Sequence, residues 1–239
     1  MSKKIIIVGA TSGIGRKIAE IYLEKGNKVG VTGRREHLLQ ELMGKFPNQV
    51  ETECFDVTKD KNIFHLESLI TKLGGLDILI ISAGIGEPSI ELKWEIDKKT
   101  VLTNVYGFIE IANWAFNFFV KQGYGQLAVI SSIAANGPSS RAASYSASKS
   151  FQSIYAEGLS LKARRLKKKI FVTCVEPGFV NTKIPQTKNP FWVIPVEKAA
   201  RQIINAINKK KRKVYISKRW WIIAKMIRWM PYFIYKRLA

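Results

Sequence analysis

Long apolar runs are missing from this chain of 239 residues. The opening letters, MSKKIIIVGA, hold an apolar run only at positions 5–8, and the run at 220–224 is hardly longer. A signal peptide needs roughly 7 to 15 apolar residues, and a membrane-spanning helix needs roughly 20. We therefore expect a cytoplasmic protein without a transmembrane helix.

Cysteine and histidine are scarce, with two residues of each. Cys54 and Cys174 lie far apart without the short spacing of a metal site, so we interpret both as reduced, buried thiols. His37 and His65 fall in predicted outer helices and indicate neither metal binding nor catalysis. Neither a disulfide scaffold nor a metal site is expected.

Acidic residues are also few, with 18 against 39 basic residues and a net charge of +21. Fourteen of the acidic residues precede Lys98, while basic residues crowd into 162–169, 209–213 and the last twenty positions. This charge attracts polyanions, so nucleic acid, anionic lipid and an anionic cofactor are all possible partners. The alternative is a well-solvated lysine-rich surface without a specific partner. Since no nucleic-acid recognition motif is present, specific nucleic-acid binding is not expected.

Apolar strand-like runs alternate with amphipathic helical segments along residues 1–217. The run at 4–8 precedes a helical pattern with apolar residues at 14, 18, 21 and 22, and the alternation then repeats. Strands that are apolar throughout and separated by helices predict a parallel sheet covered on both faces. We expect a single α/β domain with a Rossmann-like doubly wound sheet, whose ligands bind beyond the carboxyl ends of the strands.

The loop after the first predicted strand reads GATSGIG, with glycines at 9, 13 and 15. Glycine lets the backbone approach a pyrophosphate closely, and the N-terminus of the following helix offers free N–H groups. A tight turn without a ligand could have the same letters. The position between the first strand and the first helix favours dinucleotide binding.

The stretch YSASK places Tyr145 and Lys149 on one face of a predicted helix, because residues at i and i+4 are neighbours. Ser132 ends the preceding strand at the same rim of the sheet. A free phenol has a pKa of about 10, and we expect the neighbouring ammonium to lower it. Three polar groups are thus predicted to converge on a site for proton transfer.

These motifs stand in the order found in the short-chain dehydrogenase/reductase family, which the chain resembles as far as about Ser217. The ordered signals are GATSGIG at 9–15, SAG at 82–84, Asn104, SS at 131–132 with YSASK thirteen residues on, and PG at 177–178 followed by Thr182. The resemblance implies that Tyr145 is the general acid or base and that Ser132 holds the substrate oxygen. It further implies that Lys149 binds the nicotinamide ribose and that Asn104 positions a water in the proton relay. Ser131 is the alternative candidate for the serine that holds the substrate oxygen, and the spacing to Tyr145 favours Ser132.

The resemblance also implies a nicotinamide cofactor held by a larger set of residues. This set is Gly9, Thr11, Ser12, Gly13, Ile14, Gly15, Arg34, Asp56, Val57, Ala83, Gly84, Tyr145, Lys149, Pro177, Gly178 and Thr182. Asp56 and Val57 match the adenine contact of the family, although Asp56 has the alternative of capping the next helix. Val8 and Ser82 depart from the usual Thr and the frequent Asn, which affects loop-supporting hydrogen bonds rather than chemistry.

The second predicted strand ends in VTGRREH. An NAD site usually has an acidic residue here, whereas the 2′-phosphate of NADP needs cationic donors. No acidic residue precedes Glu36, and Arg34 and Arg35 offer guanidinium forks. We predict NADP(H) as the cofactor, with Arg34 preferred over Arg35 because it comes first after the strand.

Residues 179–195 correspond to the variable lid of the family, and loop 85–90 to the opposite wall of the site. Phe179, Ile184, Phe191 and Trp192 offer apolar contacts to a substrate, or else pack on the protein itself. We expect an oxidoreductase that acts on a carbonyl or hydroxyl group of an apolar or mixed small molecule. The alternative is a catalytically silent NADP(H)-binding sensor or scaffold, which would normally have lost the Ser, Tyr or Lys.

Two predicted helices, at 96–120 and 144–166, carry more apolar positions than one sheet-facing stripe requires. The surplus includes Trp114, Phe116, Phe118 and Phe119. A second buried face indicates a partner subunit, and the resemblance implies a homodimer or homotetramer.

Residues 218–239, KRWWIIAKMIRWMPYFIYKRLA, form a basic, aromatic tail beyond the family pattern. Its predicted apolar helical surface consists of Trp220, Trp221, Ile223, Ile227 and Met230. Tryptophans beside Lys and Arg suit peripheral contact with an anionic membrane. Packing over the substrate pocket or a subunit interface is equally open.

Overall fold

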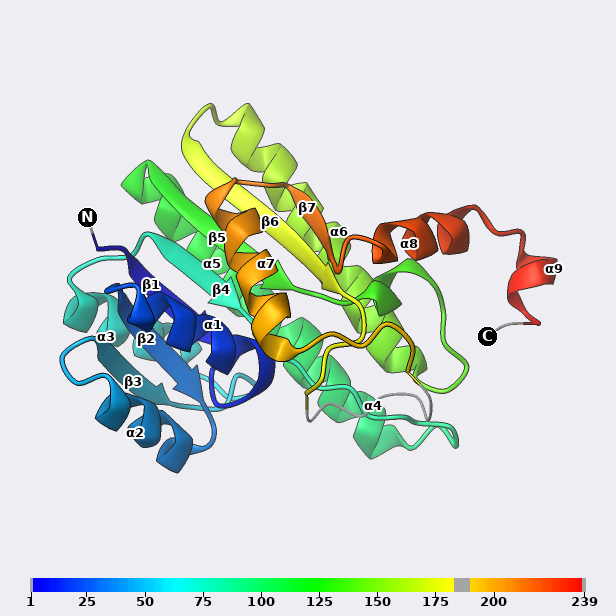
Figure 1. Cartoon of the computed structure of the whole chain (residues 1–239), viewed down its shortest axis with the longest axis horizontal. Helices are drawn as coiled ribbons and strands as arrows, with labels where there is room; N and C mark the ends of the chain where they lie inside the picture. The colour runs from blue at the N-terminus through cyan, green and yellow to red at the C-terminus, as the bar shows by residue number, and fades with distance from the viewer. Residues whose placement is uncertain (1, 183–189, 238–239) are drawn as a thin grey trace.

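The computed structural model describes residues 2–182 and 190–237. It contains a seven-stranded sheet in the order β3-β2-β1-β4-β5-β6-β7, with every pair of neighbours parallel. The strands are β1 (Lys4–Val8), β2 (Lys28–Gly33), β3 (Val50–Cys54), β4 (Ile78–Ile81), β5 (Tyr124–Ile130), β6 (Lys169–Pro177) and β7 (Lys213–Ile216). The predicted doubly wound α/β fold is confirmed (Figure 1).

Helices follow most strands and cover both faces of the sheet. They are α1 (Gly13–Glu24), α2 (Glu36–Lys45), α3 (Asn62–Leu73), α4 (Trp94–Val101), α5 (Gly107–Gln122), α6 (Ala143–Arg165), α7 (Val196–Asn208), α8 (Trp220–Trp229) and α9 (Tyr232–Tyr235). A π-helical turn, Leu102–Tyr106, joins α4 to α5, and a 3₁₀ turn, Ile133–Asn136, follows β5.

The side chains of β1 show how the two faces are filled. Ile5 and Ile7 belong to the core that contains α1, α2 and α7, whereas Ile6 and Val8 belong to the core that contains α3, α5 and α6. All four are fully buried, because crossover helices cover a parallel sheet on both faces. The apolar run at the start of the sequence therefore forms the centre of the domain.

The chain winds from β1 outward to β3 and then returns to the other side of β1 with β4. This reversal makes a topological switch point, where the loops after neighbouring strands part and leave a crevice. The loops after β1, β4, β5 and β6 carry the predicted glycine loop, Ala83–Gly84, Ser132 and Pro177–Gly178. The fold thus brings the predicted motifs to one edge of the sheet.

Three expectations about burial need correction. Cys174 is buried as expected, but Cys54 is exposed because it ends the edge strand β3. Phe116 and Phe119 do not belong to a spare outer face, since both are buried in the subunit's own core. Trp220 is also buried, and Ile223, Ile227 and Met230 are half-buried, so Trp221 is the only exposed member of the apolar surface predicted for the tail.

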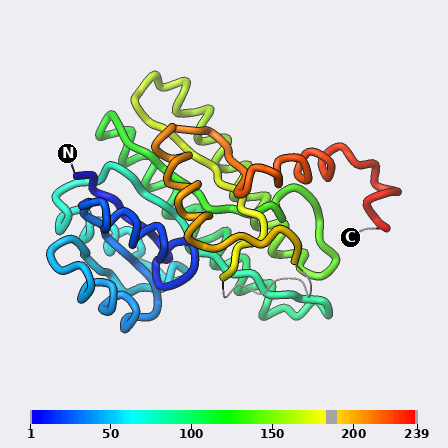
Figure 2. The backbone as a smooth tube through the Cα atoms, in the orientation of Figure 1, coloured from blue at the N-terminus to red at the C-terminus, as the bar shows by residue number. Residues whose placement is uncertain are grey.

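The C-terminal helices α8 and α9 extend away from the sheet beyond β7 (Figure 2). Among the described residues, no helix combines the length and apolarity needed to cross a bilayer. The same part of the chain contains no cluster of three His, Cys, Asp or Glu side chains that could hold a metal ion.

Candidate active site

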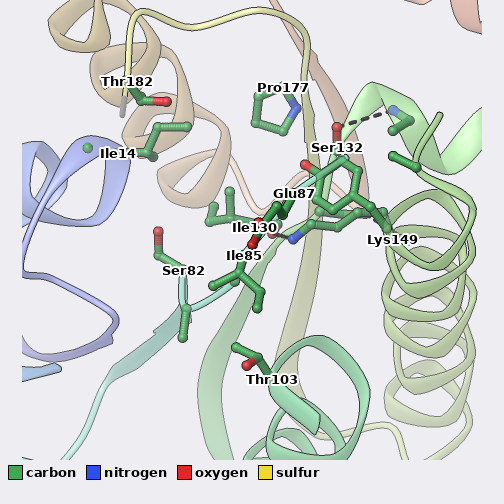
Figure 3. A pocket seen from close by; sticks show the side chains of 18 of the residues that line it. Ile14, Ser82, Ile85, Glu87, Thr103, Ile130, Ser132, Lys149, Pro177 and Thr182 are labelled. Atoms are coloured by element: carbon green, nitrogen blue, oxygen red, sulfur yellow. Dashed lines mark hydrogen bonds between the residues drawn. The ribbon is translucent and has the colours of Figure 1, made fainter. Parts of the chain in front are cut away.

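A cavity of about 1110 Å³ opens at the carboxyl ends of the strands. Its walls come from the loops after β1 to β6, from the first turns of α6, and from α8 and α9. Figure 3 shows Lys149, Ser132 and Ile130 close together, with Ile14 and Thr182 farther along the same space. One cavity therefore joins the predicted cofactor loop to the predicted proton-transfer groups.

The glycine loop is shaped so that side chains are excluded from it. Gly9 has φ +86°, and a Cβ there would lie 2.5 Å from the amide nitrogen of Ala83. A Cβ on Gly15 would lie 2.2 Å from the carbonyl oxygen of Gly9. Gly13 begins α1 with φ +58°, so the free N–H groups of the helix start face the cavity without a covering side chain. This cradle fits the pyrophosphate of a dinucleotide.

The two arginines after β2 have different partners, although both line the cavity. Arg35 reaches back to the glycine loop and donates from Nε to Thr11 Oγ1 at 3.1 Å and from Nη2 to Ser12 Oγ at 2.8 Å. Arg34 lies 3.5 Å from Asp56 Oδ2 and is about half exposed. Both arginines thus reach the cavity, and the Arg35 fork is the one joined to the hydroxyls of the glycine loop.

Asp56 and Val57 both line the cavity, as the adenine contact requires. Asp56 Oδ1 accepts hydrogen bonds from the backbone N–H and the hydroxyl of Thr58, both at 3.0 Å. Burial acts to raise the pKa of Asp56, but the bonds from Thr58 and Arg34 prevail and lower it. The alternative role as a helix cap does not apply, since α3 begins only at Asn62.

Ser132 and Tyr145 meet on the side of the cavity formed by β5 and α6. Ser132 Oγ accepts the backbone N–H of Ala134 at 3.1 Å and also bonds to the phenol of Tyr145. The hydroxyl of Ser131 instead donates to the carbonyl of Lys149 at 2.8 Å. Ser132 is thus the serine whose hydroxyl lies next to the phenol, and Ser131 ties β5 to α6.

Lys149 is buried beneath the phenol ring, with Nζ 5.8 Å from the ring centroid of Tyr145. Its Nζ donates to the carbonyl of Ile130 at 3.2 Å and to Gln152 Oε1 at 2.9 Å. Burial lowers the pKa of Lys149 to about 8, because it penalises the ammonium form. The ammonium therefore persists at neutral pH but titrates within a range that an assay can reach.

The expected lowering of the phenol pKa is wrong for this arrangement. Burial raises the pKa of Tyr145 above its ordinary value, and the bond to Ser132 only partly opposes that effect. The ammonium of Lys149 faces Ile130 and Gln152 rather than the phenolic oxygen, so it does not offset the burial. The phenol of Tyr145 therefore stays protonated at neutral pH.

Asn104 lies in the π-helical turn and is fully buried, so it does not itself face the cavity. Its side chain accepts from the N–H of Ile85 at 2.9 Å and donates to the carbonyl of Ile85 at 2.8 Å. It also donates to Ser148 Oγ at 3.0 Å. Asn104 thus pins loop 85–90 against α6, where a Cβ on Gly86 would lie 2.8 Å from the ring of Tyr145.

Gln152 is a site residue that the motifs did not reveal. It is buried one turn after Lys149, accepts from the ammonium, and donates from Nε2 to the carbonyl oxygen of Asn104 at 2.9 Å. Its amide therefore links the ammonium of Lys149 to the backbone of the π-helical turn. The only sequence signal was a polar residue at i+3 from Lys149 on the inward face of a helix.

A buried carboxylate supports the site from below. Glu176, in an otherwise apolar stretch of β6, is fully buried and lies 2.7 Å from Lys213 Nζ on β7. It also accepts from Asn136 at 2.7 Å and from Ser153 at 2.8 Å, and the Oγ atoms of Ser153 and Ser131 lie 2.9 Å apart. Sequence reasoning missed Glu176, although a charged residue within an otherwise apolar strand was a signal for it.

Pro177, Gly178 and Thr182 line the cavity on the side of the lid. The indole of Trp220 lies against Gly178, where a Cβ would come 2.0 Å from Nε1. The rings of Phe179, Phe191 and Trp192 pack on one another and on Trp220. Of the three aromatic residues Phe179, Phe191 and Trp192, only Phe179 also lines the cavity. Ile184 lies outside the described residues.

Sequence comparisons extend over most of the chain. Residues 3–191 match the family model for short chain dehydrogenases. An oxidoreductase of Myxococcus xanthus is 33% identical over 190 residues, which cover 77% of this chain and 74% of that protein. An oxidoreductase of Mycobacterium tuberculosis is 27% identical and aligns with 95% of this chain and 92% of its own length.

Solved structures share the fold. A short chain dehydrogenase from Burkholderia cenocepacia in complex with NADP has a TM-score of 0.83 at 23% identity, with 100% of this chain and 98% of that chain covered. A 3-ketoacyl-(acyl-carrier-protein) reductase from Brucella melitensis complexed with NADH has a TM-score of 0.80 at 21% identity, covering 90% and 96%. The structural similarity shows the fold, and the family model together with the Myxococcus relative shows the family. This chain belongs to the short-chain dehydrogenase family of nicotinamide-dependent oxidoreductases.

Proposed function

We propose that this protein transfers hydride between NADP(H) and a carbonyl/hydroxyl pair of an apolar or mixed small molecule. The observation that carries the proposal is the junction of Tyr145, Ser132 and Lys149 with the glycine loop in one cavity. A bound nicotinamide would supply or accept the hydride. A catalytically silent sensor is disfavoured, since none of the three groups is lost.

Each side chain has a defined task in this proposal. Tyr145 gives its phenolic proton to the substrate oxygen during reduction and takes it back during oxidation. Ser132 donates a hydrogen bond to the same oxygen. The ammonium of Lys149 binds the nicotinamide ribose. Gln152 keeps that ammonium in place.

The preference for NADP(H) rests on the cations after β2. Arg34 and Arg35 line the cavity, and the hydroxyls of Thr11 and Ser12 lie within reach of the Arg35 fork. Guanidinium forks and hydroxyls are donors, which a 2′-phosphate needs and a free ribose hydroxyl does not. The likeness to a dehydrogenase solved with NADP supports this choice, whereas the likeness to the NADH complex leaves it to be tested.

The substrate end of the cavity is mostly apolar. Ile85, Phe179, Trp220 and Ile227 form much of its lining, while Glu87 and Arg141 add charge. Such a wall binds a lipophilic carbonyl compound better than a sugar, because little polar surface is available to replace the hydration of hydroxyl groups.

The test is consumption of NADPH with a series of carbonyl compounds of increasing chain length. Tyr145→Phe should lower turnover at least about 100-fold while cofactor binding changes little, since only the proton donor is removed. Tyr155→Phe, on the same helix and outside the cavity, is the matched control. Activity of Tyr145→Phe within a few fold of wild type would reject the assignment. Tight NADPH binding without turnover of any compound would favour the sensor.

A further inference from the structure

Helices α8 and α9 expose seven large apolar side chains. Trp229 is 82% exposed, Tyr232 76% and Phe233 64%. We call this set the tail face, and its members are Trp221, Ile222, Met226, Trp229, Tyr232, Phe233 and Ile234. Single exposed apolar residues are ordinary on a protein surface, but seven of them within the fourteen residues 221–234 indicate an interaction site.

Helix α8 has two apolar stripes, of which only one is needed for packing. Trp220, Ala224 and Ile227 follow the spacing i, i+4, i+7; the first two are buried, and Trp220 and Ile227 line the cavity. Ile222, Met226 and Trp229 repeat that spacing on the other side and are each more than half exposed. The first stripe packs α8 against the rest of the domain, so the second stripe remains available to a binding partner.

Positive charge surrounds the tail face. Lys225 and Arg228 are exposed on α8 beside the outer stripe. Six basic residues and no acidic one occur in 218–239, and the last acidic residue of the chain is Glu197. The partner must therefore offer both an apolar environment and negative charge.

We propose that the tail face binds the surface of an anionic lipid bilayer. Tryptophan and tyrosine rings suit the boundary between headgroups and acyl chains, and Lys or Arg beside them reach the anionic headgroups. A second copy of this chain would bring the same positive charge to the contact and be repelled. A nucleic acid would meet the charge but leave the apolar stripe in water.

The geometry fits a helix that lies in the plane of the membrane surface. At about 1.5 Å per residue, ten residues of α8 extend roughly 15 Å, about half the thickness of a bilayer core. Figures 1 and 2 show α8 and α9 extending from the body, so the tail face can approach a flat surface. Because the inner stripe lines the cavity, docking would bring a helix that forms one wall of the cavity onto the membrane, which suits the lipophilic substrate of the proposed function. The membrane contact itself does not depend on that function.

Sedimentation with vesicles tests the proposal on the full chain. Wild type should bind phosphatidylcholine vesicles that contain phosphatidylglycerol, and should bind pure phosphatidylcholine vesicles much less. The triple variant Ile222→Ser/Met226→Ser/Trp229→Ser should bind at least about tenfold more weakly, because the apolar stripe is lost. Its control is Phe64→Ser/Tyr124→Ser/Leu166→Ser, which removes three exposed apolar side chains far from the tail.

A second pair of variants isolates the charge. Lys225→Gln/Arg228→Gln should weaken binding and flatten its salt dependence more than Lys25→Gln/Lys28→Gln, which removes the same charge elsewhere. Brominated phosphatidylglycerol reports directly on contact, since bromine quenches tryptophan that enters the lipid. Trp229→Phe should lose much of that quenching, and Trp114→Phe, in the core layer, should not.

Three results would overturn the proposal. Wild type could fail to bind phosphatidylglycerol vesicles, or the tail-face variant could bind as tightly as its control. Wild type could also be an oligomer that the tail-face variant converts to monomers, with no vesicle binding, which would make the face a subunit contact. Because none of these readouts needs turnover, their failure is distinct from failure of the proposed function.

Discussion

The ammonium of Lys149 has two described acceptors, and one of them is the side chain of Gln152. An oxygen that accepts from an ammonium favours its charged form, while burial opposes it and brings the pKa to about 8. The amide of Gln152 also holds the carbonyl of Asn104, so it fixes the distance between α6 and the π-helical turn. Gln152 is therefore a positioning residue for the proposed chemistry.

We predict that Gln152→Met shifts the alkaline limb of the pH profile to lower pH. Lys149 is charged below its pKa of about 8 and neutral above it, so activity that needs the ammonium falls as the pH rises through that value. Loss of the acceptor lowers the pKa further, and kcat/KM at pH 8 should drop about tenfold. Gln202→Met, on α7 and outside the cavity, is the control. An unchanged alkaline limb would contradict this role.

We also predict that the arginine pair selects the cofactor. Arg35→Asp and Arg34→Asp should each weaken NADPH binding about tenfold or more while affecting NADH far less, because a carboxylate repels a 2′-phosphate and accepts a ribose hydroxyl. Fluorescence titration with both cofactors measures this. Arg201→Asp, which makes the same change of charge on α7, should leave both affinities nearly unchanged. Equal losses of NADPH and NADH would show that the pair is not the selector.

At the scale of elements, β6, β7 and α6 are joined by charges that are shielded from water. Glu176 on β6 pairs with Lys213 on β7, and Lys213 also lies 2.9 Å from Glu157 on α6. Burial acts to lower the pKa of Lys213, but the carboxylates prevail and raise it. This cluster fixes the sheet edge from which α8 departs and the floor beneath Ser131.

We predict that Lys213→Met costs about 3 kcal/mol or more of unfolding free energy, because Glu176 is left buried without its counter-charge. The double variant Glu176→Leu/Lys213→Met should regain much of that loss, since the uncompensated carboxylate is gone. Urea unfolding followed by circular dichroism measures both. A double variant that is less stable than Lys213→Met would show that the carboxylate needs no partner.

At the scale of the whole molecule, α6 still exposes apolar side chains after the core is filled. Ile154 is 71% exposed and Leu161 56%, and their spacing of seven residues puts them on one face of the helix. Trp114 and Phe118 on α5 are only partly buried. This surface is smaller than the sequence implied, because Phe116 and Phe119 point into the core.

We propose that this face forms a twofold contact in a homodimer or homotetramer, in line with the family resemblance. Light scattering should give a mass above that of the monomer, and Ile154→Asp/Leu161→Asp should reduce it because the contact is isologous and each change acts twice. Phe64→Asp, on the exposed side of α3, is the control. A monomer at micromolar concentration for the wild type would contradict the proposal.

The sequence by itself determined the fold and the set of motifs. Apolar runs and helical spacing are local patterns, so β1, α1 and the alternation of strands and helices along the chain followed from them. The glycine loop, Ser132, Tyr145 and Lys149 were found because backbone shape and proton chemistry demand particular residue types at particular spacings. Parallel topology alone then brings them to one edge of the sheet.

The tertiary structure decided which partner each of these side chains meets. Arg35 rather than Arg34 contacts the glycine loop, and Lys149 faces Gln152 rather than the phenol oxygen, because neighbouring elements fix their rotamers. The sequence predicted one apolar surface on the tail that included Trp220. Only the packing against the cavity showed that Trp220 faces inward and that Ile222, Met226 and Trp229 are the exposed stripe. The pKa values of Tyr145 and Lys149 also depend on the tertiary structure, because burial by distant segments of the chain sets them.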